Sequence, residues 1–112
     1  MKIVKVSETS IKETPHKIDA RELYNFDSAQ VVHIELKPGE SLKPHKTPVD
    51  VFFYILEGSP DIYIGDDKQT VEKDCLVESP KNITHYFANN SANKVRVLVV
   101  KAPKPVTQTK LL

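Results

Sequence analysis

The feature that most constrains this chain is a series of short hydrophobic runs separated by turn-forming residues. Residues 31–36 alternate in polarity, as a half-buried strand does, and Val51–Leu56 is a continuous apolar run typical of a central strand. Gly65-Asp66 predicts a hairpin turn. Further short strands are expected at residues 61–64, 69–71, 76–77, 84–88 and 94–101. About eight to ten strands without intervening helices predict an all-β fold, an antiparallel sandwich or barrel.

Composition narrows the classes of function. Lys and Arg total 16 and Asp and Glu total 15 in 112 residues, so the net charge of +1 argues against nucleic-acid and membrane-surface binding. The single cysteine excludes an internal disulfide and the Cys-rich zinc classes. The longest apolar run is far shorter than the ~20 residues of a membrane span, and residues 1–15 lack the apolar stretch of a signal peptide. We therefore expect a cytoplasmic protein with no nucleic-acid or membrane partner.

Residues 1–28 are interpreted as an N-terminal strand and a connection. The apolar residues at positions 3–6 predict an edge strand. Asp19 and Glu22 have the spacing of a capping box, which predicts one short turn of helix around Ala20–Tyr24. An irregular polar connection is the alternative for this segment.

Two segments match a known pair of motifs. Residues 39–58, from Gly39 through His45 to Gly58, resemble the first cupin motif, G-x5-H-x-H-x3,4-E-x6-G. Residues 74–89, with His85 near their end, resemble the second, G-x5-P-x-G-x2-H-x3-N. The chain thus resembles a small single-domain cupin of the type-2 class. The resemblance implies an antiparallel β-barrel, the double-stranded β-helix or jelly roll, as one domain over residues 1–112 with a polar tail at 103–112.

The motifs depart from the family pattern at the metal-binding positions. Cupins that hold a transition metal usually do so with three histidines and one glutamate. The second histidine position is Thr47 here and the glutamate position is Val51, so the resemblance leaves only His45 and His85 as metal ligands. Two imidazoles and water hold a divalent metal (Zn, Mn, Ni, Fe or Cu) weakly, and the alternative is no metal.

Strand parity defines a candidate pocket. Side chains alternate faces along a strand, so His45, Thr47, Val51 and Phe53 share one face, while Asp50 lies opposite and is not expected to be a ligand. On a second strand His85 and Phe87 share a face. In the family these faces point inward, which predicts a mostly apolar small-molecule site. Its residues are His45, Thr47, Val51, Phe53, His85 and Phe87.

Two histidines lie outside the motifs. His33 shares a strand face with Glu35, and either could supply a third metal ligand if that face is inward. Otherwise His33 belongs to the surface or to an interface. His16, in the irregular N-terminal segment, is expected to be solvated.

Three functions remain open at this point. The first is a small cupin that binds a small polar or anionic molecule, with or without a weakly held metal. The second is a metal-dependent cupin enzyme of the dioxygenase, isomerase or decarboxylase type, using an extra ligand outside the motifs. The third is a non-catalytic dimeric scaffold, since fold alone does not determine function.

The expected partner protein is a second copy of this chain. Phe52, Tyr54 and Leu56 face away from the pocket, and a second apolar sheet face must be covered. Small cupins are commonly dimers, so the resemblance implies a homodimer through this strand or the N-terminal strand.

Overall fold

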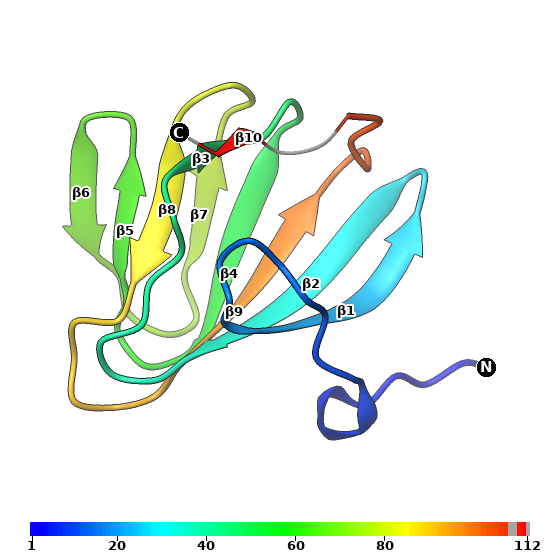
Figure 1. Ribbon diagram of the computed structural model, residues 1–112, viewed down its shortest axis with the longest axis horizontal. Coiled ribbons are helices and arrows are strands. Elements are labelled where there is room, and N and C mark those ends of the chain that lie inside the picture. Colours follow the sequence, from blue (N-terminus) through cyan, green and yellow to red (C-terminus); the bar gives the residue numbers. More distant parts are fainter. Residues whose placement is uncertain (108–109, 112) are drawn as a thin grey trace.

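The computed structural model describes residues 1–107 and 110–111, which form two antiparallel five-stranded sheets packed face to face (Figure 1). In the larger sheet the strand order is β1 (Asp19–Phe26), β2 (Ala29–Leu36), β9 (Val95–Lys101), β4 (Val51–Glu57) and β7 (Leu76–Ser79). In the smaller sheet it is β10 (Lys110–Leu111), β3 (His45–Lys46), β8 (His85–Ala88), β5 (Asp61–Ile64) and β6 (Asp67–Thr70). The expected all-β jelly roll is confirmed.

The core follows directly from strand parity. Ile34 of β2, Val97 of β9 and Ile55 of β4 are cross-strand partners in one row, and all three are buried against the smaller sheet. Because side chains on one face of neighbouring strands stand side by side, each such row adds one layer to the hydrophobic core. Strand parity, which can be counted along the sequence, therefore indicates which residues of these strands are buried.

The two sheets do not close into a barrel. Among the described residues no ladder joins the larger sheet to the smaller one, so the jelly roll is an open sandwich. Next to the edge strand β10, β3 is two residues long, with Pro44 directly before it and Pro48 two residues after it. Proline lacks the N–H that a ladder needs, so Pro44 and Pro48 limit how far this strand can extend.

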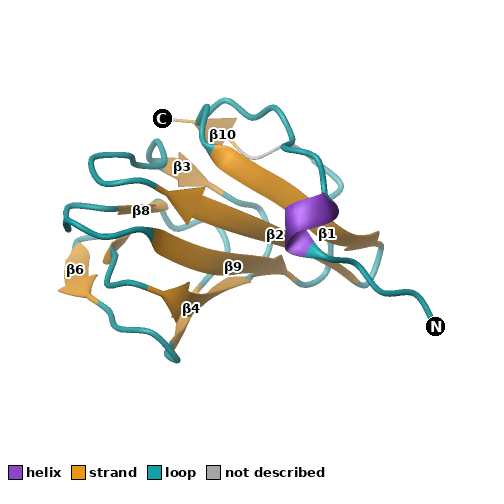
Figure 2. Ribbon diagram, turned by 90° about the horizontal axis from the view of Figure 1, so that it is seen from below, coloured by secondary structure: helices purple, strands orange, loops and turns teal. Residues whose placement is uncertain are grey.

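The N-terminal predictions were wrong in two places. Residues 1–5 form no strand, and Val6–Glu8 form a short 3-10 helix, η1, beside the larger sheet (Figure 2). The segment Ala20–Tyr24 is not helical but lies within β1, where Ala20 pairs with Ile34 and is fully buried. Burial of Ala20 against the core and a full ladder with β2 outweigh the local capping signal, since tertiary packing overrides weak propensity.

A hairpin and the C-terminal tail form the two ends of the smaller sheet. The hairpin predicted at Gly65-Asp66 connects β5 and β6, and Gly65 adopts the positive φ of 57° that its tight turn requires. The tail was predicted as a polar extension from residue 103, but its strand β10 pairs with β3. Positions 108–109 and 112 of the tail lie outside the described residues. No helix in the described part of the chain is long and apolar enough to span a membrane.

The outer face of β4 carries the half-buried side chains of Phe52, Tyr54 and Leu56, as expected from their parity. Homodimerisation through this face stays a prediction.

Candidate functional site

A partly open cavity of about 100 Å³ lies between the two sheets. A water molecule occupies about 30 Å³ of liquid, so this space suits about three waters or a ligand of roughly four to six non-hydrogen atoms. The wider hollows of the molecule open on its outer surface instead. The cavity is lined by Thr14, His16, Ile18, Ala20, Val32, Ile34, Leu42, His45, Thr47, Phe53, His85, Val99 and Lys101.

His45 and His85 are brought together by the pairing of β3 with β8. They are direct cross-strand partners, so their side chains point to the same face, and their ring centroids are 4.5 Å apart. Both are buried. The two motif histidines therefore meet across one cavity, although they are far apart in the sequence.

His85 is held at both ring nitrogens. Its Nδ1 is 2.6 Å from Ser79 Oγ at the end of β7, and its Nε2 is 3.2 Å from Thr47 Oγ1. A hydroxyl both donates and accepts, so the two contacts satisfy either neutral tautomer of the ring. Burial, with smaller contributions from His45 and Lys101, lowers the pKa of His85 to about 3. His85 is thus a neutral, fixed wall of the cavity.

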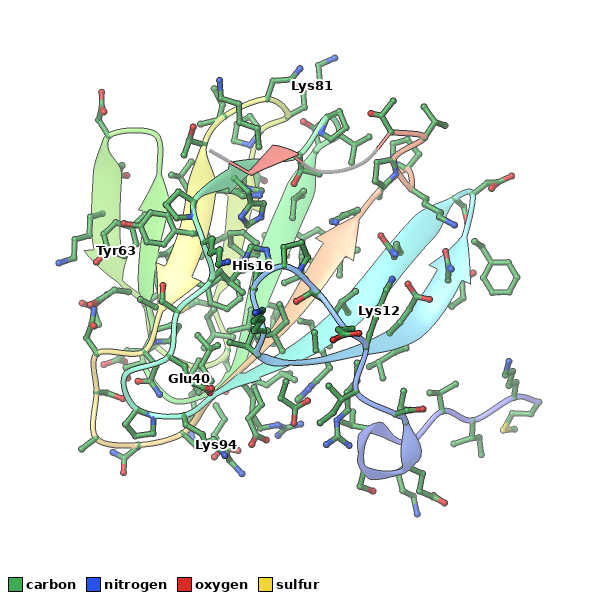
Figure 3. All side chains as sticks on the ribbon, viewed as in Figure 1. Lys12, His16, Glu40, Tyr63, Lys81 and Lys94 are labelled. Carbon is green, nitrogen blue, oxygen red and sulfur yellow. The ribbon has the colours of Figure 1, made fainter. Side chains whose placement is uncertain are left out.

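His16 reaches the cavity from the tip of a β-turn. Lys17 N–H donates to Thr14 C=O at 3.1 Å, and Pro15 occupies the first central position, which its fixed φ favours. The turn lies between the sheets, in front of the larger one, with His16 at its tip (Figure 3). His16 and His45 have ring centroids 4.8 Å apart. The expectation that His16 is solvated was therefore wrong.

The backbone of Lys43 sets the tautomers of these two rings. Lys43 N–H donates to His16 Nδ1 at 2.8 Å, so the proton of neutral His16 is on Nε2. Lys43 C=O accepts from His45 Nδ1–H at 2.7 Å, so neutral His45 has its lone pair on Nε2. Neighbouring imidazoles that line the cavity thus carry one donor and one acceptor at their Nε2 atoms.

Both rings are neutral near pH 7. Burial, followed by the nearby His45 and Lys43, lowers the pKa of His16 to about 4. Burial also lowers the pKa of His45, partly offset by its bond to the Lys43 carbonyl. The tautomers given by the hydrogen bonds are therefore those that a ligand meets at neutral pH.

Two further polar groups lie at the cavity. In the described part of the chain the buried Thr14 Oγ1 has no hydrogen-bond partner. Lys101, the last residue of β9, lines the cavity as well, and burial lowers its pKa. The sequence reasoning missed Thr14, His16, Ser79 and Lys101. Only Lys101 had a signal, because Val95, Val97, Val99 and Lys101 alternate on one face.

The predicted ligand residues fall into two groups. His45, Thr47, Phe53 and His85 line the cavity. Phe87 lies behind it, fully buried with its ring centroid 5.2 Å from that of Phe53. Val51 is buried too, but it lines a separate hollow with Asp50 and Phe52.

His33 is not brought to the site. It is almost fully buried, but on the outer side of the larger sheet, where it shares a hollow with Glu35 and Arg96. Its cavity-lining neighbours are Val32 and Ile34, so parity turns both His33 and Glu35 away from the interior. Neither residue can be the additional ligand of a metal bound at His45 and His85.

The donor set does not fit a resident divalent metal. A metal ligand needs a free lone pair, and Nε2 of His16 carries a proton while both nitrogens of His85 contact hydroxyls. Among these three rings, His45 Nε2 alone keeps a lone pair free for a metal. The described lining residues include no carboxylate that could add a second ligand. Across the described chain no three His, Cys, Asp or Glu side chains are grouped to hold a metal ion.

Comparison with known families agrees with this fold. Residues 32–101 match the family described as Cupin domain (Cupin_2), which is more than half of the chain. This chain therefore belongs to the cupin domain family. No curated protein sequence matches it.

Solved structures show the same fold at low sequence identity. The polyketide cyclase RemF from Streptomyces resistomycificus is 20% identical, with a TM-score of 0.85 over 100% of this chain and 85% of that one. An RmlC-like cupin family protein from Methanocaldococcus jannaschii is 25% identical, with a TM-score of 0.74 over 92% and 94%. A predicted oxalate decarboxylase from Thermotoga maritima is 17% identical, with a TM-score of 0.80 over 99% and 100%.

Proposed function

We propose that this cupin binds a small oxygen-rich molecule, a carbonyl compound or carboxylate of roughly four to six non-hydrogen atoms, in the interior cavity. The observation that carries the proposal is the pair of opposite tautomers imposed by Lys43. A donor at His16 Nε2 and an acceptor at His45 Nε2 fit a ligand that has both an oxygen acceptor and a hydroxyl group, as a hydroxy acid or the hydrate of an aldehyde does.

The other lining groups support an oxygen ligand. The buried hydroxyl of Thr14 has no protein partner in the described residues, and a buried unpaired polar group costs about 1–3 kcal/mol unless it is satisfied. Lys101 adds a cationic or amine group, and the lining residues include no carboxylate among those described. Apolar walls such as Phe53 exclude water and strengthen each polar contact.

The proposal needs no resident metal. The site residues do not fit one, so the alternative of a metal-dependent enzyme has no support from the donor chemistry. The structural relatives include a polyketide cyclase and a predicted oxalate decarboxylase, and the fold alone selects neither activity.

Ligand-observed NMR with acetate, glycolate, glyoxylate and pyruvate tests the proposal, with acetamide as a neutral control and ethylamine as a cationic control. We expect at least one acid to bind and the amine not to bind. Thr14→Val keeps the side-chain volume and breaks no protein hydrogen bond shown by the structure. It should weaken binding by about tenfold, the effect of losing about 1.4 kcal/mol, at unchanged stability.

Asp50→Asn is the matched control, because Asp50 is exposed and lies outside the cavity lining. It should leave binding unchanged. Equal weakening by both variants, or no binding of any acid, would contradict the proposal. Stoichiometric binding of Zn²⁺ or Mn²⁺ that is lost in His45→Phe would show instead that the site is a metal centre.

A further inference from the structure

One wall of the cavity is a loop rather than a strand. Residues 13–17, which we call the cavity loop, lie between η1 and β1, with His16 at the tip (Figure 3). Lys12 N–H donates to Ala20 C=O at 2.6 Å, and this hydrogen bond closes the base of the loop. Thr14 and His16 line the cavity, so the loop covers it from one side.

The other walls of the cavity are held mostly by backbone hydrogen bonds. Most of their residues belong to paired strands of the two sheets. Leu42 lies outside the named strands, but its N–H donates to Phe87 C=O at 3.0 Å. Thr47 also lies outside them, and its C=O accepts from Asn82 N–H at 2.9 Å. Movement of these walls must break backbone hydrogen bonds to the smaller sheet or within a sheet, so they are expected to open last.

The cavity loop is attached at a single point, which we call the latch. Lys43 N–H donates to His16 Nδ1 at 2.8 Å. In the part of the chain that the structure describes, no other hydrogen bond or ion pair joins residues 13–17 to the rest of the molecule. The His16 ring also packs against that of His45, with centroids 4.8 Å apart. Opening of the loop therefore breaks one hydrogen bond and one ring contact, and both sheets stay intact.

We propose that the cavity loop is a lid, which opens at the latch to admit the ligand and closes over it. This rests on the proposed function, because a lid acts on binding only if the cavity takes a ligand. Closure returns Thr14 and His16 to the cavity wall, so the polar groups that contact the ligand are completed as water is excluded.

Amide hydrogen exchange followed by NMR measures opening of the latch in the ligand-free chain. The Lys43 amide is bonded to the His16 ring, whereas the adjacent Leu42 amide is bonded to the smaller sheet. After correction for intrinsic rates, Lys43 should exchange at least about 100-fold faster than Leu42, because opening of the lid exposes only Lys43. Equal protection of the two amides would overturn the proposal, since the loop would then open only together with the sheet.

Two substitutions at one position separate the latch from the bulk of the ring. In His16→Asn, Oδ1 takes the place of Nδ1 as the acceptor, so Lys43 should keep its protection. His16→Phe keeps a ring but has no acceptor, so Lys43 should lose its protection. The Leu42 amide is the control in both variants and should not change. Equal protection of Lys43 in the two variants would contradict the latch.

The last experiment tests whether the ligand must wait for the lid. Whichever of glycolate, glyoxylate, acetate and pyruvate binds best is added at ten times its Kd. If only the closed lid holds it, exchange of Lys43 should slow by about tenfold. The Lys104 amide is the control, because its bond of 3.1 Å to Asp27 C=O lies outside the cavity lining and should open as before.

The outcomes separate this inference from the proposed function. Binding of an acid by ligand-observed NMR with no slowing at Lys43 would overturn the lid and leave the proposed function standing. Failure of all four acids to bind would overturn both, even if the latch opens.

Discussion

His85 and His33 are both almost fully buried, at 2% and 1% exposure, yet they lie in opposite parts of the molecule. His85 faces the interior, where hydroxyls contact both of its nitrogens beside a cavity. His33 faces outward, where Arg96 Nε–H donates to its Nε2 at 3.0 Å and its Nδ1 has no partner among the described residues. Burial alone therefore does not identify a site residue.

The difference lies in what surrounds each ring. The inner face of the larger sheet combines apolar walls with a few polar groups that converge on one space. The outer face instead carries neighbouring opposite charges: Glu35 pairs across strands with Arg96, and Arg96 is 3.5 Å from Glu57. On the outer face these charged groups lie beside one another, whereas at the cavity the buried Thr14 Oγ1 has no hydrogen-bond partner among the described residues.

The largest expected effect contrasts the two faces of β4 directly. Phe53→Ala should lower the free energy of unfolding by about 3–5 kcal/mol, because it leaves a void beside Phe87 and His85 in the core. Phe52→Ala, on the half-buried outer face, should cost only about 1 kcal/mol. Urea titration measures both. A loss at Phe52 equal to that at Phe53 would show that the outer face is covered in solution, as the predicted homodimer requires.

The next effect is a pH dependence. The pKa of His85 is about 3 in the folded chain and near 6.5 when unfolded, so between these values only the unfolded chain binds the proton. The free energy of unfolding should therefore fall as pH falls, by about 1–2 kcal/mol between pH 7 and pH 5. In His85→Gln this part of the slope should disappear from urea titrations at the two pH values. An unchanged slope would refute the assignment, whatever the stability of the variant.

A smaller effect concerns the outer histidine. Arg96→Met removes the donor to His33 Nε2, which should cost about 1 kcal/mol. Burial is the main cause that lowers the pKa of His33, and the charge of Arg96 is the second. The pKa of His33 should therefore rise toward its ordinary value in the variant, as followed by NMR titration of its ring protons. No change would mean that the guanidinium does not act on this ring.

The smallest expected effect is that of an exposed ion pair. Glu57→Gln removes contacts of 3.5 Å to Arg96 and 3.9 Å to Lys94, and Glu57 is 45% exposed. Solvent-exposed pairs contribute about 0–1 kcal/mol, so we expect a change near the lower end and no effect on ligand binding. Thermal unfolding at low and high salt gives the measurement. A larger loss would mean that the outer charges stabilise the fold as strongly as the inner cavity walls do.

Much of the fold could be predicted from sequence because the signals were local. Alternation located β2, the apolar run located β4, and Gly65-Asp66 located the β5–β6 hairpin. The resemblance to the two cupin motifs implied the pair His45 and His85 that the β3–β8 ladder brings together. Parity also excluded Asp50 from the interior. Its carboxylate instead lies on the outside, where it accepts a hydrogen bond from Lys81 N–H at 2.9 Å.

The N-terminal segment shows where local signals fail. A capping box at Asp19 and Glu22 suggested a helix, but those residues lie in β1, and Glu22 accepts from Gln30 of β2 instead. His16 lies in an irregular connection with no periodicity, so nothing near it in the sequence indicates that its ring approaches His45. Its place depends on a backbone contact to Lys43, which lies far along the chain.

Beyond the N-terminal segment, the sequence by itself located most of the longer strands and the side chains of each strand that share a face, because both depend on neighbours one or two positions away. Only the tertiary structure decided which faces meet. The inward side chains of β3, β8 and β9 became a site when the turn carrying His16 closed over them and Lys43 oriented two rings in opposite senses. The physical reason is that a tautomer, a buried amine and a partly open cavity are each produced by groups that are distant in sequence, so no local pattern contains them.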